Sequence, residues 1–426
     1  MFEFSNEKIT FEWNELTDSG MGRKLSYEGK ELNFIGENYF KIPDYSSIPI
    51  PHRERRQLSF DPHRSDIIFS PKAKELFEEV LNATKQIYEN KEYQQKYNNT
   101  ELRRAGSLLC ATLFESLAGF WEQMLLSQNL DRLGISFWRQ ILDIVNNWQE
   151  NNDGIFIHKG TLYYFLAENY FLVGDLDSAF TYLHNALKID EQTWQWEQEG
   201  HIGAYSLSKM IDDPYTQMNY LTKQHRKQLD GFIKKFNSEF GDLTLEEVSN
   251  KFLKNEEKYH IISYFFVFTF HSLIHHKHNL KLETPENYFS KVRSLDMIFN
   301  LCLIIDDILK NRFLDSFPDD KKYFSNGINE YCKKFNFDYM TFQKKWKQER
   351  KFDRTNPNKT IQLLLQKEEK YEGNSLPKEV YTLMLAHYCR NIGAHSLNEN
   401  SFFVTQYQKI IDELMMGLFL AIKSID

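Results

Sequence analysis

Half of the prolines in this chain fall in one short segment, and the rest of the sequence is poor in residues that interrupt helices. Five of the ten prolines lie between Pro43 and Pro71, and the 426 residues include only 18 glycines. Because proline fixes φ and lacks a backbone N–H, this segment is predicted to be an extended connector. Beyond it, the scarcity of Gly and Pro predicts long helices with short connections. The predicted fold class is therefore mainly α.

Chain length and hydrophobic patterning divide the sequence into three predicted parts. The chain is too long for one ordinary core, and 41% of its residues are hydrophobic. Residues 1–72 are predicted to form a small β or irregular segment and the connector, since ITFEW, KLSYEG and ELNFIG alternate apolar and polar residues. Residues 73–240 are predicted to be a helical region. Residues 241–426 are predicted to be a helical bundle, with helices at about 246–277, 286–313, 361–371, 377–392 and 403–424.

Charge and cysteine usage narrow the functional classes. The chain has 52 Lys and Arg against 60 Asp and Glu, a net charge of -8, so any contact with nucleic acid must be local. Its four cysteines lie far apart and lack metal-binding spacing. The first residues lack the pattern of a secretory signal, and the most apolar window, Ile261–Ile274, is too short to cross a bilayer. We therefore expect a cytoplasmic protein that does not enter membranes.

The segment Lys159–Asp190 has the residue spacing of a helical repeat. Its alanines at positions 167, 179 and 186 would let two antiparallel helices approach closely, and Gly174 with Asp175 would make the turn between them. With Tyr163, Leu166, Tyr170, Leu183 and Leu187, these residues sit where the tetratricopeptide repeat places its large, small and turn residues. The segment therefore resembles that repeat. The resemblance implies a surface for a protein or peptide partner, although a purely structural role fits equally well.

Four histidines near the end of one predicted helix are potential metal ligands. Their positions are His271, His275, His276 and His278. The first two have i,i+4 spacing, but no glutamate stands between them as in HExxH sites, and no third ligand follows. Histidines at a helix end are therefore favoured over a metal site.

Paired carboxylates lie on another apolar helix of the predicted bundle. Asp306 and Asp307 lack the further carboxylate that would hold Mg²⁺ against a diphosphate, because Lys310 and Asn311 follow. The sequence also has no glycine-rich phosphate loop and no GxSxG elbow. We expect no metal and no other cofactor.

The segment that stands out reads YCRNIGAH and follows an apolar stretch near the C-terminus. Arg390 beside Asn391, with His395 four residues after the Asn, resembles the Arg-polar-x3-His motif of HEPN domains, a helical family that includes many metal-independent ribonucleases. Those domains are helical bundles with the motif near the last two helices, and here another apolar helix follows. The resemblance implies a C-terminal HEPN-like bundle that forms a homodimer with two motifs facing one cleft. It also suggests a role in stress or antiphage defence, as in toxin systems.

The residue types of this motif suit RNA cleavage. A histidine with a pKa of about 6.5 can take a proton from a 2′-hydroxyl or give one to the leaving 5′-oxygen, which is the role expected of His395. The guanidinium of Arg390 can hold the scissile phosphate, and Asn391 can orient either group. The resemblance implies products with a 2′,3′-cyclic phosphate and a 5′-hydroxyl. Asp306 and Asp307 are weaker candidates for orienting the two catalytic groups.

Helix geometry raises an objection to this site. On an ideal helix Arg390 and His395 point about 140° apart. Either Gly393 ends the helix early, or a partner subunit completes each half-site. Two alternatives stay open: the two cations cap the helix C-terminus, or the chain is a non-catalytic scaffold that binds RNA without cutting it.

A basic stretch precedes the motif and is predicted to contact RNA. Its candidate phosphate-binding residues are Lys344, Lys345, Lys347, Arg350 and Lys351. Trp346 lies among these cations, with Phe342 just before them and Phe352 just after them, and the three rings are candidates for stacking on bases. The alternative is a solvated helix face whose rings are buried.

Overall fold

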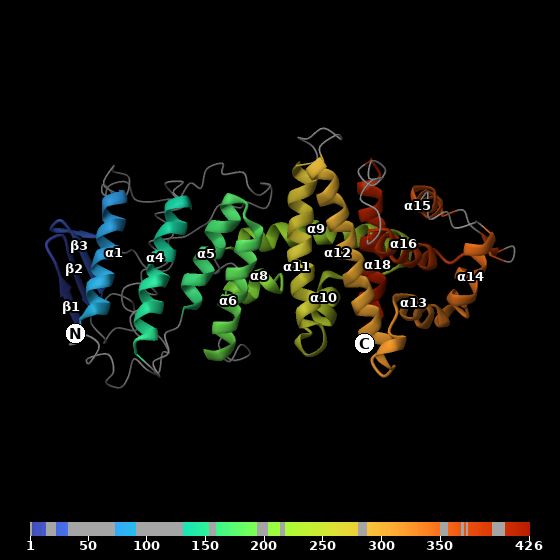
Figure 1. Cartoon of the computed structure of the whole chain (residues 1–426), viewed down its shortest axis with the longest axis horizontal. Coiled ribbons are helices and arrows are strands. Elements are labelled where there is room, and N and C mark those ends of the chain that lie inside the picture. Colours follow the sequence, from blue (N-terminus) through green and yellow to red (C-terminus); the bar gives the residue numbers. More distant parts are fainter. Residues whose placement is uncertain are drawn as a thin grey trace. The chain divides into compact units, whose positions relative to one another are not determined.

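The computed structural model describes residues 2–13, 23–32, 73–90, 131–152, 159–193, 203–213, 218–279, 288–349, 357–367, 370–371, 374–393 and 405–426. Most of these residues are helical, which confirms the mainly α fold class (Figure 1). The predicted connector between Pro43 and Pro71 lies outside the described residues. No helix in the described part of the chain combines the length and the apolar character needed to span a bilayer.

The chain divides into two compact units. Unit 1 comprises Met1–Ser206 and Asp213–Tyr220, and unit 2 comprises Leu207–Asp212 and Leu221–Asp426. Helices α8 (Gly203–Ser208) and α9 (Asn219–Phe240) cross from one unit to the other. The boundaries expected from the sequence, after residues 72 and 240, stay predictions.

Unit 1 begins with a four-stranded antiparallel sheet. Its strands follow one another in order: β1 (Phe2–Ser5), β2 (Ile9–Trp13), β3 (Arg23–Tyr27) and β4 (Lys30–Leu32). The Asn6 side chain accepts hydrogen bonds from the N–H groups of Lys8 and Ile9 and so fixes the first turn. Glu28 and Gly29 both have positive φ, 48° and 73°, as a tight two-residue hairpin requires. The segment ITFEW therefore forms β2 and most of KLSYEG forms β3, whereas residues 33–36 of ELNFIG lie outside the described residues.

Four helices of unit 1 stand side by side in chain order (Figure 1). They are α1 (Ala73–Glu89), α4 (Asp131–Glu150), α5 (Gly160–Val173) and α6 (Leu176–Thr193). Aromatic rings fill their interfaces, as in the edge-to-face contact of Phe77 with Phe137 at 5.0 Å. The Lys8–Glu79 ion pair, at 2.9 Å, joins α1 to the β1–β2 turn.

The predicted helix–turn–helix between Lys159 and Asp190 is present as α5 and α6. Gly174 ends α5 with φ 81°, a left-handed conformation that favours glycine, and its N–H donates to the Phe171 carbonyl. The alanines at positions 167, 179 and 186 are fully buried, which allows the close approach of the two helices. Whether the pair is a true tetratricopeptide repeat stays a prediction.

Unit 2 is a helical bundle built from the C-terminal half of the chain. Its longer helices are α9, α11 (Glu256–Asn279), α12 (Tyr288–Phe313), α13 (Phe324–Cys332), α14 (Tyr339–Glu349), α15 (Pro357–Gln366), α16 (Lys378–Gly393) and α18 (Tyr407–Lys423). Its short elements are α10 (Leu245–Val248), the π-helical turn η4 (Ser249–Leu253), the 3-10 turns η5 (Asp319–Lys321) and η6 (Lys333–Phe335), and a small hairpin, β5 (Lys370–Tyr371) with β6 (Asn374–Ser375).

One predicted helix of unit 2 is interrupted. The sequence predicts a continuous helix over 246–277, but the structure has α10, the turn η4 and then α11. Thr244 starts α10 with a reciprocal cap, in which the Glu247 N–H donates to the Thr244 hydroxyl and the Thr244 N–H donates to the Glu247 carboxylate. The π-helical turn breaks the register before α11 begins, which periodicity alone does not reveal.

The centre of unit 2 is α12, which packs against α11, α13, α16 and α18. Gly417 of α18 lies in close contact with this core, since a Cβ there would meet Ile305 and Thr382 at 3.4 Å. On α12, Leu301, Ile305 and Ile308 are fully buried. The core therefore fixes the end of α16 against α12, where the candidate site lies.

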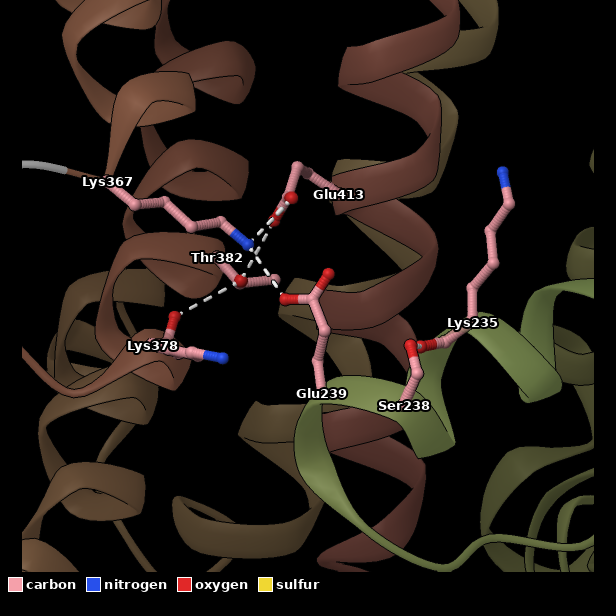
Figure 2. A network of polar contacts seen from close by, with 7 residues as sticks. All are labelled: Lys235, Ser238, Glu239, Lys367, Lys378, Thr382 and Glu413. Atoms are coloured by element: carbon pink, nitrogen blue, oxygen red, sulfur yellow. Dashed lines mark hydrogen bonds and ion pairs between the residues drawn. The ribbon is translucent and has the colours of Figure 1, made fainter.

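A polar network also ties three helices of unit 2 together. The ammonium group of Lys367, just after α15, lies 2.8 Å from the Glu413 carboxylate of α18 and 3.2 Å from that of Glu239 on α9 (Figure 2). Thr382 of α16 lies 3.1 Å from Glu413 and links the same network (Figure 2). The two carboxylates raise the pKa of Lys367 against the opposing effect of burial. The two carboxylates share this one ammonium group, and the contacts join the helices of unit 2.

Candidate active site

Helix α16 carries the motif Arg at its C-terminal end. One face of the helix is apolar and buried, including Val380, Leu383 and Met384. Arg390 stands in the last turn, where a cation interacts favourably with the helix dipole. The preceding residue, Cys389, is buried, whereas Arg390 keeps 31% of its side chain exposed. The helix thus presents the guanidinium at the edge of the bundle.

A buried carboxylate on α12 holds this guanidinium. Asp306 is fully buried, and one of its oxygens, Oδ2, lies 3.0 Å from Nη2 of Arg390 and 2.9 Å from Nζ of Lys310. Its other oxygen, Oδ1, has no hydrogen-bond partner among the described residues. Burial raises the pKa of Asp306, and the hydrogen bond from Lys310 and the charge of Arg390 oppose that rise. This ion pair restrains Arg390 at Nη2, while about a third of the Arg390 side chain stays exposed.

An aromatic ring and a histidine extend the site from α13 and α16. The guanidinium carbon of Arg390 lies 5.9 Å from the centre of the Phe324 ring, within the range of a cation–π contact. The same ring lies 5.5 Å from His387, one turn before Arg390. Nδ1 of His387 is 3.0 Å from the Tyr339 hydroxyl and 2.9 Å from the Gln343 amide nitrogen. Helices α12 and α13 therefore contact Arg390 of α16, and α14 contacts His387 one turn before it.

The structure describes only some of the other motif residues. Asn391 is exposed in the last turn of α16, next to Arg390. Gly393 is the last residue of α16, and His395 lies outside the described residues. The relative placement of Arg390 and His395 therefore stays a prediction. Of the two acidic candidates, Asp306 forms the ion pair with Arg390. Asp307, the next residue of α12, is exposed and makes no such pair among the described residues; partial burial raises its pKa, and the charges of Lys310 and Arg390 oppose that rise.

Helix α14 carries the described part of the basic stretch. Asp338 caps its start by accepting hydrogen bonds from the N–H and hydroxyl of Thr341. Lys344 and Lys345 are exposed, whereas Phe342 and Trp346 are buried among the helices. The buried rings favour the interpretation of α14 as a helix with a solvated face, and they make base stacking by these two rings a poor explanation. Only the backbone of Lys347 is described, and Arg350, Lys351 and Phe352 lie outside the described residues.

The histidines of α11 make separate contacts. His271 is buried and its Nδ1 lies 2.8 Å from Nε2 of His225 on α9, whereas His276 pairs with the Ser294 hydroxyl at 2.9 Å. Burial lowers the pKa of His225 to about 3 and lowers that of His271 as well. Within the described part of the chain, no three His, Cys, Asp or Glu side chains gather as metal ligands would. The contacts of His271 and His276 are those of neutral, buried rings.

No family model, no curated protein and no solved structure matches this chain.

Several members of the site were not identified from the sequence. The i,i+4 spacing of Asp306 and Lys310 on one helix face signals their ion pair. The i,i+3 spacing of His387 and Arg390 likewise places them on one side of α16. Nothing in the sequence indicates that Phe324 would lie beside Arg390, because that contact depends on how α13 packs.

Proposed function

We propose that this protein is a metal-independent endoribonuclease of the HEPN type. The observation that supports it best is the fixing of Arg390, within the RNIGAH motif, by the buried Asp306 carboxylate at 3.0 Å, with about a third of the Arg side chain still exposed. A site that holds a phosphate needs a cation of fixed position that remains accessible. A fully exposed arginine would lack the first property, and a buried one would lack the second.

In the proposed reaction, the RNA supplies its own nucleophile. A base, His395, takes the proton of a ribose 2′-hydroxyl while the 2′-oxygen attacks the adjacent phosphorus. The bond from phosphorus to the 5′-oxygen breaks, and that oxygen receives a proton from an imidazolium. Arg390 balances the negative charge that grows on the phosphate, and Asn391 orients the reacting groups. The products carry a 2′,3′-cyclic phosphate and a 5′-hydroxyl, and no cofactor takes part.

The proposal includes a homodimer in which two motifs share one cleft. A dimer supplies two histidines, so one can act as base while the other acts as acid. The basic residues Lys344, Lys345, Lys347, Arg350 and Lys351 would guide the RNA backbone, and the helices α5 and α6 would take a protein or peptide partner. A role in stress or antiphage defence is part of this proposal.

A non-catalytic scaffold that binds RNA is the second candidate. It is favoured by the same Asp306–Arg390 pair, because an ion pair between α12 and α16 also ties two helices together. The two functions differ in whether RNA is cut.

Cleavage in the presence of EDTA tests the proposal. Purified parent protein, Arg390→Ala and His395→Ala are each incubated with total RNA and with tRNA, and the fragments are resolved on a gel. The nuclease proposal expects cleavage by the parent and at least a hundredfold slower cleavage by both variants. Equal cleavage by the parent and His395→Ala would remove His395 from the mechanism. An intact RNA with a folded, dimeric parent that still binds it would favour the scaffold.

A further inference from the structure

RNA held at Arg390 by its phosphate would leave its bases to be bound elsewhere. The rings first considered for that role, Phe342 and Trp346, are 2% and 5% exposed and pack inside unit 2. Among the described side chains, Tyr323 is the large aromatic ring that is exposed, at 62%. A ring so open to solvent contributes little to packing and has a free face for another ring.

The backbone of Tyr323 is fixed although its ring is exposed. Tyr323 stands at the start of α13, and its N–H donates to the Lys321 carbonyl at 3.0 Å. Its own carbonyl accepts from the N–H groups of Asn326 and Gly327, at 2.9 and 3.1 Å. The side-chain amide of Asn326 also donates to the Lys321 carbonyl, at 2.7 Å. A ring on such a turn is presented from a defined position, which lowers the entropy cost of stacking.

The next residue ties this turn to the candidate active site. Phe324 points inward, is 1% exposed and lies 5.9 Å from the guanidinium carbon of Arg390. Adjacent Cα atoms are about 3.8 Å apart, so the Cα of Tyr323 lies within about 14 Å of that guanidinium. A short stretch of single-stranded RNA spans this distance. The Cα of Tyr323 is therefore within reach of a nucleotide that neighbours a phosphate bound at Arg390.

The charges around Tyr323 cancel. Lys322 pairs with Asp319 at 3.0 Å, and the exposed Asp320 and Lys321 carry opposite charges. The turn therefore offers an aromatic face without a net electrostatic attraction for the RNA backbone. Binding at Tyr323 would depend on stacking, whereas binding at the lysines of α14 would depend on salt.

We propose that Tyr323 stacks on an unpaired nucleobase close to the phosphate bound by Arg390, and so makes the site selective for single-stranded RNA. This inference rests on the proposed function, because it places the scissile phosphate at Arg390. Stacking needs an unpaired base but accepts any of the four bases. Tyr323 is therefore expected to favour single-stranded RNA over duplex RNA without distinguishing base sequences.

Binding of a non-cleavable RNA tests the role of Tyr323. The probe is a fluorescein-labelled 2′-O-methyl oligonucleotide of about twelve nucleotides, within the usual footprint of single-strand binding sites. Its affinity is measured by fluorescence anisotropy for the parent, Tyr323→Ala and Tyr323→Phe. The control is Ile261→Ala, which removes another exposed side chain, 80% exposed, on α11. We expect Tyr323→Ala to bind about tenfold more weakly, and the Phe and control variants to bind like the parent.

A single abasic nucleotide, moved along the probe, identifies the stacked base. At one position it should weaken binding by the parent about tenfold and have no further effect on Tyr323→Ala, because both changes remove the same contact. The slope of affinity against salt should be the same for the parent and Tyr323→Ala, since no charge is lost. If the loss of affinity caused by the abasic nucleotide adds to that caused by Tyr323→Ala at every position of the probe, the stacking is overturned.

The outcomes separate this inference from the proposed function. Cleavage by the parent with unchanged binding by Tyr323→Ala overturns the role of Tyr323 alone. Weaker binding by Tyr323→Ala without any cleavage by the parent supports stacking and overturns the nuclease. A parent that neither binds nor cleaves single-stranded RNA overturns both.

Discussion

The Arg390 guanidinium lies 3.0 Å from the carboxylate of Asp306, which is completely buried. The two residues come from α16 and α12, and Lys310 shares the same carboxylate oxygen. An ion pair with one buried and one half-exposed partner restrains the cation without removing it from solvent. We therefore expect Asp306 to position Arg390.

Replacing Asp306 with alanine should lower both stability and cleavage. Arg390 and Lys310 would lose their shared partner, but both are exposed enough to reach water, so the expected loss in free energy of unfolding is about 2 kcal/mol. RNA cleavage should fall by at least tenfold because Arg390 is no longer held. Denaturant unfolding and a cleavage assay measure the two effects. The exposed neighbour provides the control: Asp307→Ala should change stability by less than about 0.5 kcal/mol, and equal effects of the two variants would contradict the role of Asp306.

The buried histidine pair predicts that stability depends on pH. The pKa of His225 in the folded protein is about 3, because burial disfavours the charged ring, whereas an unfolded histidine has a pKa of about 6.5. Between these values the unfolded state binds a proton that folded His225 does not bind. The free energy of unfolding should therefore fall as pH falls below about 6.5, and His225→Gln should reduce this slope by up to about 1.4 kcal/mol per pH unit. Denaturant unfolding of the parent and of His225→Gln, from neutral to mildly acidic pH, measures this slope. A free energy of unfolding of the parent that does not change with pH would contradict the burial of the histidine pair.

Replacing two helix glycines with alanine should change the stability of the protein in opposite directions. A Cβ on Gly134 of α4 would lie 2.2 Å from Oδ1 of Asn169, a buried residue whose amide donates to the Phe165 carbonyl. Gly134→Ala should therefore destabilise the protein by about 2 kcal/mol. A Cβ on Gly231 of α9 meets no atom within 4 Å, so Gly231→Ala should stabilise it by about 0.8 kcal/mol through helix propensity. Thermal unfolding followed by circular dichroism compares them, and a Gly134→Ala protein as stable as the parent would refute the close packing of α4 on α5.

Charge reversal on α14 should weaken RNA binding and its dependence on salt. Lys344 and Lys345 are exposed on this helix, and replacing both with Glu should lower affinity and reduce the salt slope by about two phosphate contacts. Anisotropy titrations at several salt concentrations supply both quantities. The matched control reverses Lys85 and Lys188, two exposed lysines of unit 1, and makes the same change in net charge. If both pairs of substitutions weaken binding equally, α14 is not part of an RNA path.

The sequence predicted the elements of this protein better than their contacts. Scarce Gly and Pro predicted the helices, and the predicted helix at 286–313 corresponds to α12 at 288–313. The alternating segment ITFEW forms β2. By contrast, the π-helical turn at Ser249–Leu253 was missed, because its residues keep helical periodicity while the hydrogen-bond spacing changes.

The sequence predicts the motif residues of the candidate site but not the contacts that depend on how the helices pack. Arg390 and Asn391 are indicated by a local motif, and Asp306 and Asp307 are predicted only as weaker candidates for orienting Arg390 and His395. That the carboxylate of Asp306 and not that of Asp307 pairs with Arg390 depends on the rotation of α12 against α16, which residue spacing along each helix does not reveal. Tyr323 carries no motif at all, and its exposure follows from Phe324 taking the inward position beside it.

The chemistry of the cut RNA ends distinguishes a metal-independent nuclease from a non-catalytic scaffold. A defined single-stranded RNA is incubated in EDTA with the parent, Arg390→Ala and His395→Ala, and the termini of the fragments are analysed by mass spectrometry. Fragments with a 2′,3′-cyclic phosphate and a 5′-hydroxyl, formed by the parent and absent with both variants, are the predicted result. Fragments with a 5′-phosphate, or cyclic-phosphate ends formed equally by all three proteins, would contradict it.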